Sequence, residues 1–272
     1  MSFIQEKLVH IDLGLSRKYI LIQFNDIHAV SFNIETDNLE AIDKASKQEE
    51  TWFYLRQDFA RSFNEVYDQE SLFTSTDCLN HLIDYSNSVH PDLVLLTGDI
   101  IDYYSHENYD FLKKSIRKIK SPYLFSCGNH ESPSELFQEI CGGNCDFSYV
   151  DFVDFFVVSI DNSKRKITTE QLRRLETLVK YQKPIILAMH IPIMTEYNEK
   201  EFTQLNSYYS IKYNDCDETT SIFINLISSS DEVKAIFCGH VHGTIISHIT
   251  QNKFQYCCSS GLIGNVNKII IK

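Results

Sequence analysis

Five short apolar runs in this chain each end on residues of the kinds that bind metal ions. The endings are Asn25-Asp26-Ile27-His28, Gly98-Asp99, Gly128-Asn129-His130-Glu131, His190 and Gly239-His240-Val241-His242. Runs this short, rich in Ile, Leu, Val and Phe and bounded by Gly, Asn or Asp, are typical of buried strands rather than helices. Because neighbouring strands of a buried sheet finish side by side, we expect the five endings to meet in one crevice.

The donor types in these endings restrict the metals that could bind there. Asp, Asn and His offer hard or borderline oxygen and nitrogen donors, which suit Mn, Fe, Zn, Co or Ni rather than the soft ions that thiolates select. A lone Asp-x-His pair is most often a turn with a surface histidine. Five such endings, each following a strand, are far less expected by chance, and together they predict a site for two metal ions.

From about Leu21 to His242 the chain resembles the calcineurin-like metallophosphoesterase superfamily, whose five motifs it carries in the same order. The resemblance implies two divalent or mixed-valence transition-metal ions as cofactors. It implies that one ion is held by Asp26, His28 and His242, the other by Asn129, His190 and His240, and that the two are bridged by Asp99.

The resemblance also implies two catalytic residues that hold no metal. His130 would contact the scissile phosphate and the leaving group, and Asp102 would orient this histidine. The expected enzyme is a metal-dependent phosphohydrolase or phosphodiesterase, in which a metal-bridging hydroxide attacks the phosphoric ester. Two cations about 3.5–4 Å apart clamp phosphoryl oxygens and lower the pKa of bound water to about 7, so no Ser or Cys nucleophile is needed.

The alternation of apolar runs with helical patterns predicts an α/β fold of four layers, α-β-β-α. Two mixed sheets would face each other with helices outside, as the resemblance also implies, and the metal site would lie at the carboxyl ends of the strands. Because the motifs extend from residue 26 to residue 242, any cut between them would split the site, so we expect a single domain over residues 1–272.

Two local patterns give more specific expectations. A strand over residues 5–12 and the strand that begins at Tyr19 are predicted to pair as a hairpin across Gly14. A helix is predicted from roughly Asn38 to Phe63, with an apolar face that includes Trp52 and Phe59. That aromatic face would either pack in the core, which is the simpler interpretation, or form a platform for a substrate.

Composition bears on compartment and on partners. The chain has no apolar run of about 20 residues, and its first residues lack the pattern of a signal peptide, so we expect no membrane span and a cytoplasmic location. The eight cysteines are then read as reduced thiols, with Cys127 and Cys238 buried. Cys141 and Cys145 are interpreted as incidental thiols of a Gly-rich loop, because no second Cys pair has a compatible spacing.

The substrate class follows partly from charge. A formal net charge of −12 disfavours nucleic acid as a partner, and the favoured function is hydrolysis of a small phosphomonoester or phosphodiester. A nucleic-acid phosphodiesterase or nuclease and a non-catalytic scaffold of the same fold are the alternatives. A scaffold should lack some ligands, and none is missing. The pattern does not indicate which metals are native or which oligomeric state forms.

Two segments could contact the substrate. The tyrosine-rich stretch from Tyr197 to Tyr213 lies between two ligand strands, and it either covers the crevice or forms an ordinary surface excursion. Tyr103, Tyr104 and His106 directly follow the Gly-Asp motif and give a second candidate. Protein phosphatases of this superfamily carry an Arg where this chain has Tyr103, which counts against a phosphoprotein substrate.

Overall fold

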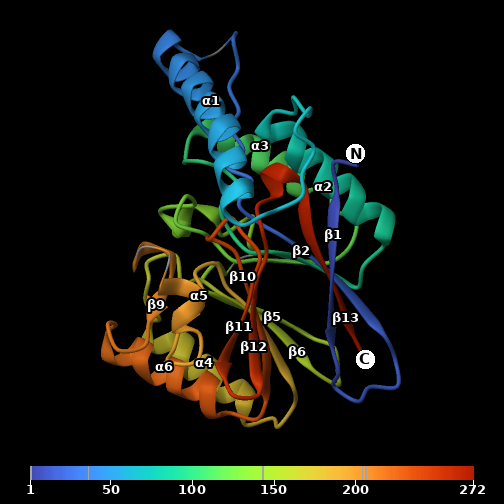
Figure 1. The fold of residues 1–272 in the computed structure, drawn as a ribbon, viewed down its shortest axis with the longest axis vertical. Coiled ribbons are helices and arrows are strands. Elements are labelled where there is room, and N and C mark those ends of the chain that lie inside the picture. The colour runs from blue at the N-terminus through green and yellow to red at the C-terminus, as the bar shows by residue number, and fades with distance from the viewer. Residues whose placement is uncertain (1, 36, 143, 204, 206) are drawn as a thin grey trace.

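The computed structural model describes residues 2–35, 37–142, 144–203, 205 and 207–272. Two mixed sheets pack face to face (Figure 1). The five-stranded sheet has the order β1 (Gln5–Ile11), β13 (Asn265–Ile271), β2 (Tyr19–Phe24), β3 (Leu93–Leu96) and β4 (Tyr123–Phe125). The six-stranded sheet has the order β11 (Ile245–Thr250), β12 (Lys253–Cys257), β10 (Val233–Cys238), β7 (Ile185–Ala188), β6 (Phe156–Ile160) and β5 (Phe147–Asp151).

Helices cover the outer face of each sheet, so the predicted α/β fold with two facing mixed sheets is confirmed. The five-stranded sheet packs against α2 (Ser75–Val89) and α3 (His106–Ile116). The six-stranded sheet packs against α4 (Thr169–Val179) and α6 (Glu218–Ser229). The remaining short elements are η1 (Ser134–Phe137), β8 (Ile193–Met194), α5 (Glu199–Thr203), η2 (Ser207–Tyr209), β9 (Ile211–Lys212) and η3 (Gly261–Ile263).

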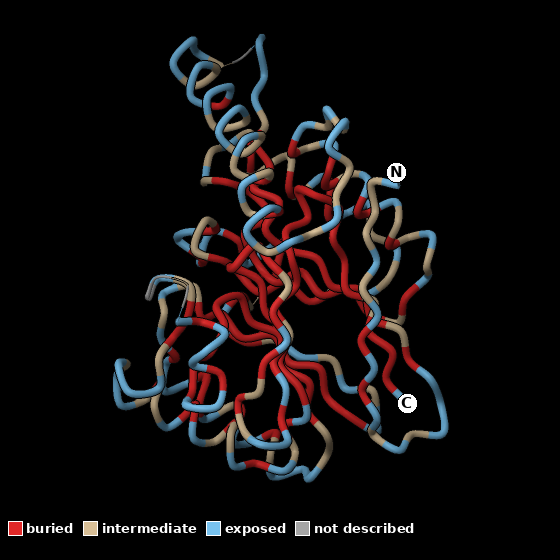
Figure 2. Tube along the Cα trace, in the orientation of Figure 1, coloured by how far each residue is buried: buried red, intermediate tan, exposed pale blue. Residues whose placement is uncertain are grey.

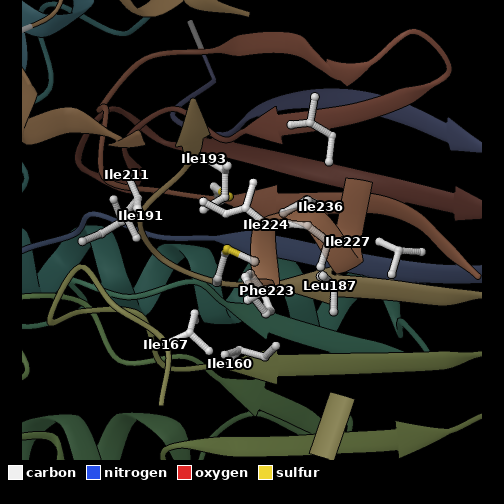
Figure 3. Close-up of a cluster of buried hydrophobic side chains, with 14 of the residues drawn as sticks. Ile160, Ile167, Leu187, Ile191, Ile193, Ile211, Phe223, Ile224, Ile227 and Ile236 are labelled. Carbon is white, nitrogen blue, oxygen red and sulfur yellow. The ribbon is translucent and has the colours of Figure 1, made fainter. Parts of the chain in front are cut away.

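Central strands such as β3 and β7 are buried on both faces, because each sheet is covered on both sides. In β3, Leu93 and Leu95 pack between the sheets, whereas Val94 and Leu96 pack towards α2 and α3. Figure 3 shows the matching cluster on the outer face of the six-stranded sheet, where Leu187 and Ile236 meet Phe223, Ile224 and Ile227 of α6. The two sheets are thereby held at fixed positions, and so are the loops that follow their strands.

Helix α1 (Leu39–Ser62) confirms the helix that was predicted from about Asn38 to Phe63. The Asn38 side chain caps it by accepting a hydrogen bond from the Ala41 amide. Its first turns project from the molecule and are exposed, while its C-terminal half returns to the protein (Figure 2). No helix among the described residues is long and apolar enough to cross a membrane.

The predicted hairpin across Gly14 is wrong, because β13 lies between β1 and β2. It pairs in parallel with β1, with Gln5 opposite Asn265, and antiparallel with β2, with Tyr19 opposite Ile271. Strand β1 alternates buried and more exposed residues, whereas six of the seven residues of β13 are buried. The more apolar strand takes the central position, and the half-polar strand takes the edge.

Candidate metal centre

The five predicted endings meet at one place, where loops from both sheets converge. The loops after β2, β3 and β4 come from three neighbouring parallel strands of one sheet, and those after β7 and β10 come from two neighbouring strands of the other. A Cβ at Gly128 would lie 2.1 Å from Asp99 Oδ1, and one at Gly98 would lie 2.5 Å from His190 Nδ1. Both motifs therefore need glycine so that the ligand side chains can approach.

The first donor group contains Asp26, His28 and His242, all of them buried. The two imidazoles direct Nε2 towards each other at 3.1 Å, and Asp26 Oδ1 lies 3.7 Å from His242 Nε2. Asn25 donates from Nδ2 to Asp26 Oδ2 at 2.6 Å and to the Cys258 carbonyl at 3.1 Å. This holds one carboxylate oxygen of Asp26 and leaves the other directed at the histidines. The sequence predicted no role for Asn25.

The second donor group gathers around His190. Its Nε2 lies 3.1 Å from Asp99 Oδ2, 3.1 Å from His240 Nδ1 and 3.2 Å from Asn129 Oδ1. The other ring nitrogens point to backbone oxygens, because His190 Nδ1 lies 2.8 Å from the Thr97 carbonyl and His240 Nε2 lies 3.0 Å from the Tyr208 carbonyl. Such carbonyl contacts orient ligand histidines and select the ring tautomer.

Asp99 lies between the two groups. Its Oδ2 is 3.1 Å from His190 Nε2 and 3.9 Å from His28 Nε2, and its Oδ1 accepts a hydrogen bond of 2.9 Å from the His130 amide. The Glu131 carboxylate accepts from the backbone amides of Asp99, Ile100, Ile101 and Gly128. Sequence reasoning missed this brace, which fixes the loop carrying Asp99 against the loop carrying Asn129. The only sequence signal was a carboxylate that directly follows the Gly-Asn-His run.

Five of these residues have a backbone conformation that L-residues rarely adopt. Positive φ values occur at Asp26 (51°), His28 (47°), Asp99 (53°), His240 (72°) and His242 (55°). Each such residue costs on the order of 1–2 kcal/mol, and clusters of them are typical of functional sites. The fold therefore maintains a strained arrangement at the strand ends that brings the donor atoms together.

His130 and Asp102 also meet at this centre. His130 Nδ1 lies 3.1 Å from Asp102 Oδ1, and it contacts the Asp102 carbonyl as well. Trp52 of α1 donates from Nε1 to the same Oδ1 at 2.8 Å. Burial disfavours the charged form of His130, but the Asp102 carboxylate outweighs this effect and raises the pKa of His130 to about 10. The imidazolium form of His130 is therefore favoured at neutral pH.

The aromatic face of α1 forms a wall behind the first donor group. The Trp52 ring stacks on His28 with a centroid separation of 3.7 Å and an interplanar angle of 16°. The Phe59 ring lies 4.5 Å from His242. The two interpretations of this face were core packing and a substrate platform, and the structure shows a third arrangement in which the rings pack on predicted ligand histidines.

Protonation differs among the donors in the absence of an ion. Burial lowers the pKa of His28, lowers that of His242 well below its usual range and lowers that of His240 to about 3, so these three rings are neutral. Burial also acts against a charged His190, but the Asp99 carboxylate outweighs it and raises the pKa of His190 to about 9. Neutral imidazole is the form that binds a metal, so three of the four rings already have it.

The side chains present fit a pair of transition-metal ions. Ligand nitrogens at about 2.0–2.1 Å from an ion lie roughly 2.9–3.4 Å apart in tetrahedral or octahedral geometry, and the His28–His242 and His190–His240 separations of 3.1 Å fall in this interval. Asp26 Oδ1 is buried and has no hydrogen-bond partner among the described residues. A buried carboxylate oxygen without a donor is costly, and a cation beside it would remove that cost.

The tyrosine-rich stretch divides into two parts. The rings of Tyr208 and Tyr209 lie 5.0 and 5.6 Å from the His240 ring, and Arg165 donates to the Tyr208 carbonyl. Tyr197 and Tyr213 instead line a separate surface depression of about 150 Å³. Among the described tyrosines of the stretch, only Tyr208 and Tyr209 are therefore next to the donor groups.

The second candidate for substrate contact is the segment with Tyr103, Tyr104 and His106, which contacts residues outside the donor groups. Tyr103 lies under Lys44, with the ammonium 3.7 Å from the ring centroid. Tyr104 packs on Phe137, and His106 is exposed beside Asp110. These contacts do not place any of the three against the donor groups, and a role for them in substrate binding stays a prediction.

Comparison with known proteins identifies the family of the chain and several relatives. Residues 21–244 match the family model described as calcineurin-like phosphoesterase. The chain is 27% identical over 198 residues to a protein of Arcobacter nitrofigilis named "Probable glycerophosphodiester phosphodiesterase GpdQ", covering 66% of each. It is 24% identical over 183 residues to a "Probable cyclic nucleotide phosphodiesterase" of Synechococcus sp., covering 63% of this chain and 66% of the relative. The matches thus span just under two thirds of these relatives.

Solved structures show the same fold at low sequence identity. A dimetal phosphatase from Danio rerio superposes with a TM-score of 0.55 and 12% identity, covering 90% of this chain and 88% of the other. A purple acid phosphatase from yellow lupin gives a TM-score of 0.50 and 13% identity, covering 93% of this chain and 45% of the other. With the family model matched over residues 21–244, the chain belongs to the calcineurin-like phosphoesterase family.

Proposed function

We propose that this protein is a metal-dependent hydrolase of small phosphoesters, with phosphodiesters as its first candidate substrates. One transition-metal ion is assigned to Asp26, His28 and His242, and a second to Asn129, His190 and His240. The position of Asp99 is the observation that carries the proposal, because its Oδ2 lies 3.1 Å from a nitrogen of one group and 3.9 Å from a nitrogen of the other. A carboxylate in this place can bridge two ions and offset their repulsion.

The names of the relatives support a phosphoester as the substrate. Two relatives are named as phosphodiesterases, and the chain shares their family. The acidic net charge of −12 opposes broad attraction of a nucleic acid, which favours a small substrate. We also propose that residues 1–272 act as one domain, because β13 at the C-terminal end lies between β1 and β2.

When bound, the two ions would supply Lewis-acid charge to the phosphoryl oxygens and a hydroxide nucleophile near neutral pH. The protein's part is to hold the donors in place and to manage the leaving group. His130, kept protonated by Asp102, can donate a proton or a charge-assisted hydrogen bond to the leaving oxygen. Asp102 is itself fixed by the Trp52 indole, so the imidazolium has one defined orientation.

The test begins with protein stripped of metal by a chelator and then reloaded separately with Mn²⁺, Zn²⁺, Co²⁺, Ni²⁺ or Fe²⁺. Each form is assayed against an aryl phosphomonoester, an aryl phosphodiester, a glycerophosphodiester, cyclic nucleotides and single-stranded DNA. We expect hydrolysis of one of the small esters that depends on added metal, with two ions per chain at the histidine–carboxylate centre. Preference for single-stranded DNA would replace the proposal with a nuclease, and two bound ions without hydrolysis of any ester would contradict it.

A further inference from the structure

A second cluster of metal-binding side chains lies apart from the centre described above. Cys127 follows β4, whereas Cys141 and Cys145 lie between η1 and β5 in the chain. All three are buried, and their sulfur atoms lie within 4.8 Å of one another. The Sγ atoms of Cys127 and Cys141 are 3.9 Å apart, and all three thiols are free.

We propose that Cys127, Cys141 and Cys145 form a thiolate site for a zinc ion. Sulfur ligands at about 2.3 Å from Zn²⁺ lie roughly 3.8–4.0 Å apart, and the Cys127–Cys141 separation has this value. Three sulfur donors in one enclosed position select a thiophilic ion, whereas the oxygen and nitrogen donors of the histidine–carboxylate centre do not. The described residues contribute three donors to this group, so a fourth position remains for water or another small ligand.

The electrostatic surroundings favour a divalent cation at this position. Each thiol interacts electrostatically with one acidic side chain, of Asp161, Glu131 or Glu135, so the cluster has acidic neighbours. Three thiolates with a divalent ion carry a net charge of −1, and with a monovalent ion −2, which is harder to bury.

The site would connect the segment after β4, which carries Cys127, to the segment between η1 and β5, which carries Cys141 and Cys145. Cys127 lies two residues before Asn129, at the base of the loop that carries the catalytic motif. The segment with Cys141 is attached to the same strand by the Tyr123 hydroxyl, which donates to the Ile140 carbonyl at 2.7 Å. The interpretation of Cys141 and Cys145 as incidental thiols rested on the lack of a further ligand pair. The third thiol comes instead from the end of a strand.

Cobalt substitution gives a direct test, because thiolate ligands produce an intense charge-transfer absorption in the near ultraviolet and His, Asp and Asn ligands do not. Metal-free protein is reduced, reloaded with Co²⁺ and compared with Cys141→Ser, Cys145→Ser and the control Cys216→Ser, whose thiol lies outside the cluster. We expect the band in the wild-type protein and in Cys216→Ser. We expect its loss in the other two variants, with one fewer equivalent of bound ion in each.

X-ray absorption of the zinc-loaded wild-type protein provides a measurement that needs no variant. Sulfur neighbours at about 2.3 Å from part of the bound zinc would support the site. Coordination by nitrogen and oxygen alone would overturn it, as would absence of the cobalt band from the reduced wild-type protein. Persistence of the band in Cys145→Ser would also overturn it. Because the readouts are spectroscopic, they stay separate from the phosphoesterase activity.

Discussion

His28 and His242 are held by aromatic rings, whereas His190 and His240 are held by backbone carbonyls. Trp52 and Phe59 pack on the first pair, and the Nδ1 atoms of both histidines have no hydrogen-bond partner among the described residues. The second pair contacts the carbonyls of Thr97 and Tyr208. Shape therefore orients the first pair, and hydrogen bonding orients the second.

The difference predicts unequal dependence on the surrounding structure. A carbonyl contact sets which ring nitrogen carries the proton, so His190 offers Nε2 and His240 offers Nδ1 to an ion. Stacking on Trp52 fixes the plane of His28 but leaves its tautomer to the neighbouring Asp102 carboxylate, whose Oδ1 is 3.6 Å from His28 Nδ1. The first group should respond to changes in α1, and the second to changes in the segment around Tyr208.

The largest effect is expected from Asp99→Asn, because Asp99 lies between the two donor groups. Removing its charge should weaken the binding of both ions and lower turnover by several orders of magnitude. The fold should persist, since Asn tolerates the positive φ at this position and can still accept from the His130 amide. Metal content by elemental analysis, turnover and thermal unfolding give the three readouts.

Asp26→Asn is the matched comparison, because Asp26 Oδ1 faces His242 of the first group, whereas Asp26 touches the second group only by accepting from the His240 backbone amide through Oδ2. The change should lower the occupancy of the first ion and leave the occupancy of the second ion unchanged. Near-normal turnover of Asp99→Asn with two ions retained would contradict the bridging assignment. Loss of a single ion from Asp99→Asn would also contradict it, because the residue would then serve one group alone.

His130→Ala should leave metal content intact and lower turnover by about 10²–10⁴-fold, the usual contribution of a positioned acid. The defect should shrink for aryl esters, since nitrophenolate needs less protonation than an alkoxide when it leaves. Paired rates with an aryl ester and an alkyl ester check this. Equal defects on both esters, or loss of an ion from the variant, would show that His130 acts elsewhere. His10→Ala, at an exposed histidine of β1, is the control.

That the donor side chains lie together could be predicted from the sequence, because they follow buried strands at recognisable Gly, Asp, Asn and His positions. The carbonyl partners could not be predicted, since the Thr97 and Tyr208 backbones carry no residue-specific signal. Trp52 was visible as part of an aromatic stripe, but a stripe alone does not distinguish ligand contacts from core packing. The position of β13 was missed because strand order depends on pairing across the whole chain, whereas a short connection favours a local hairpin.

Replacing Trp52 tests the aromatic wall with a smaller expected effect. Trp52→Ala removes both the stack on His28 and the hydrogen bond to Asp102. It should lower the affinity for the first ion by about 10–100-fold, as loss of contacts to ligand residues usually does. Trp52→Phe keeps a ring and removes the donor, so it should retain the ion and change the pH profile of turnover through His130.

Arg165→Met is the counterpart on the other side of the centre, because Arg165 donates to the carbonyls of Tyr208 and Ser210. Competitive metal titrations of this variant and of Trp52→Ala should show opposite patterns, with the second ion weakened by Arg165→Met and the first by Trp52→Ala. If either change weakens the binding of both ions equally, the aromatic rings of α1 and the segment around Tyr208 do not act independently, and the comparison fails.

The smallest effect is expected from Tyr208 and Tyr209, next to the second donor group. The rings of Tyr208 and Tyr209 lie beside His240, and Tyr208 is exposed, so they are placed to contact the organic part of an ester while the ions and His130 act on the phosphate. Replacing both by Ala should change the preference between a bulky phosphodiester and a small aryl phosphate by about tenfold, through contacts made in the transition state. The Tyr208 carbonyl remains, so metal content should not change. The measurement is the ratio of kcat/KM for the two esters, with Tyr197→Ala and Tyr213→Ala as controls on the separate depression. Equal losses on both esters together with a lower Tm would make the two rings packing residues, and an unchanged ratio would remove them from substrate recognition.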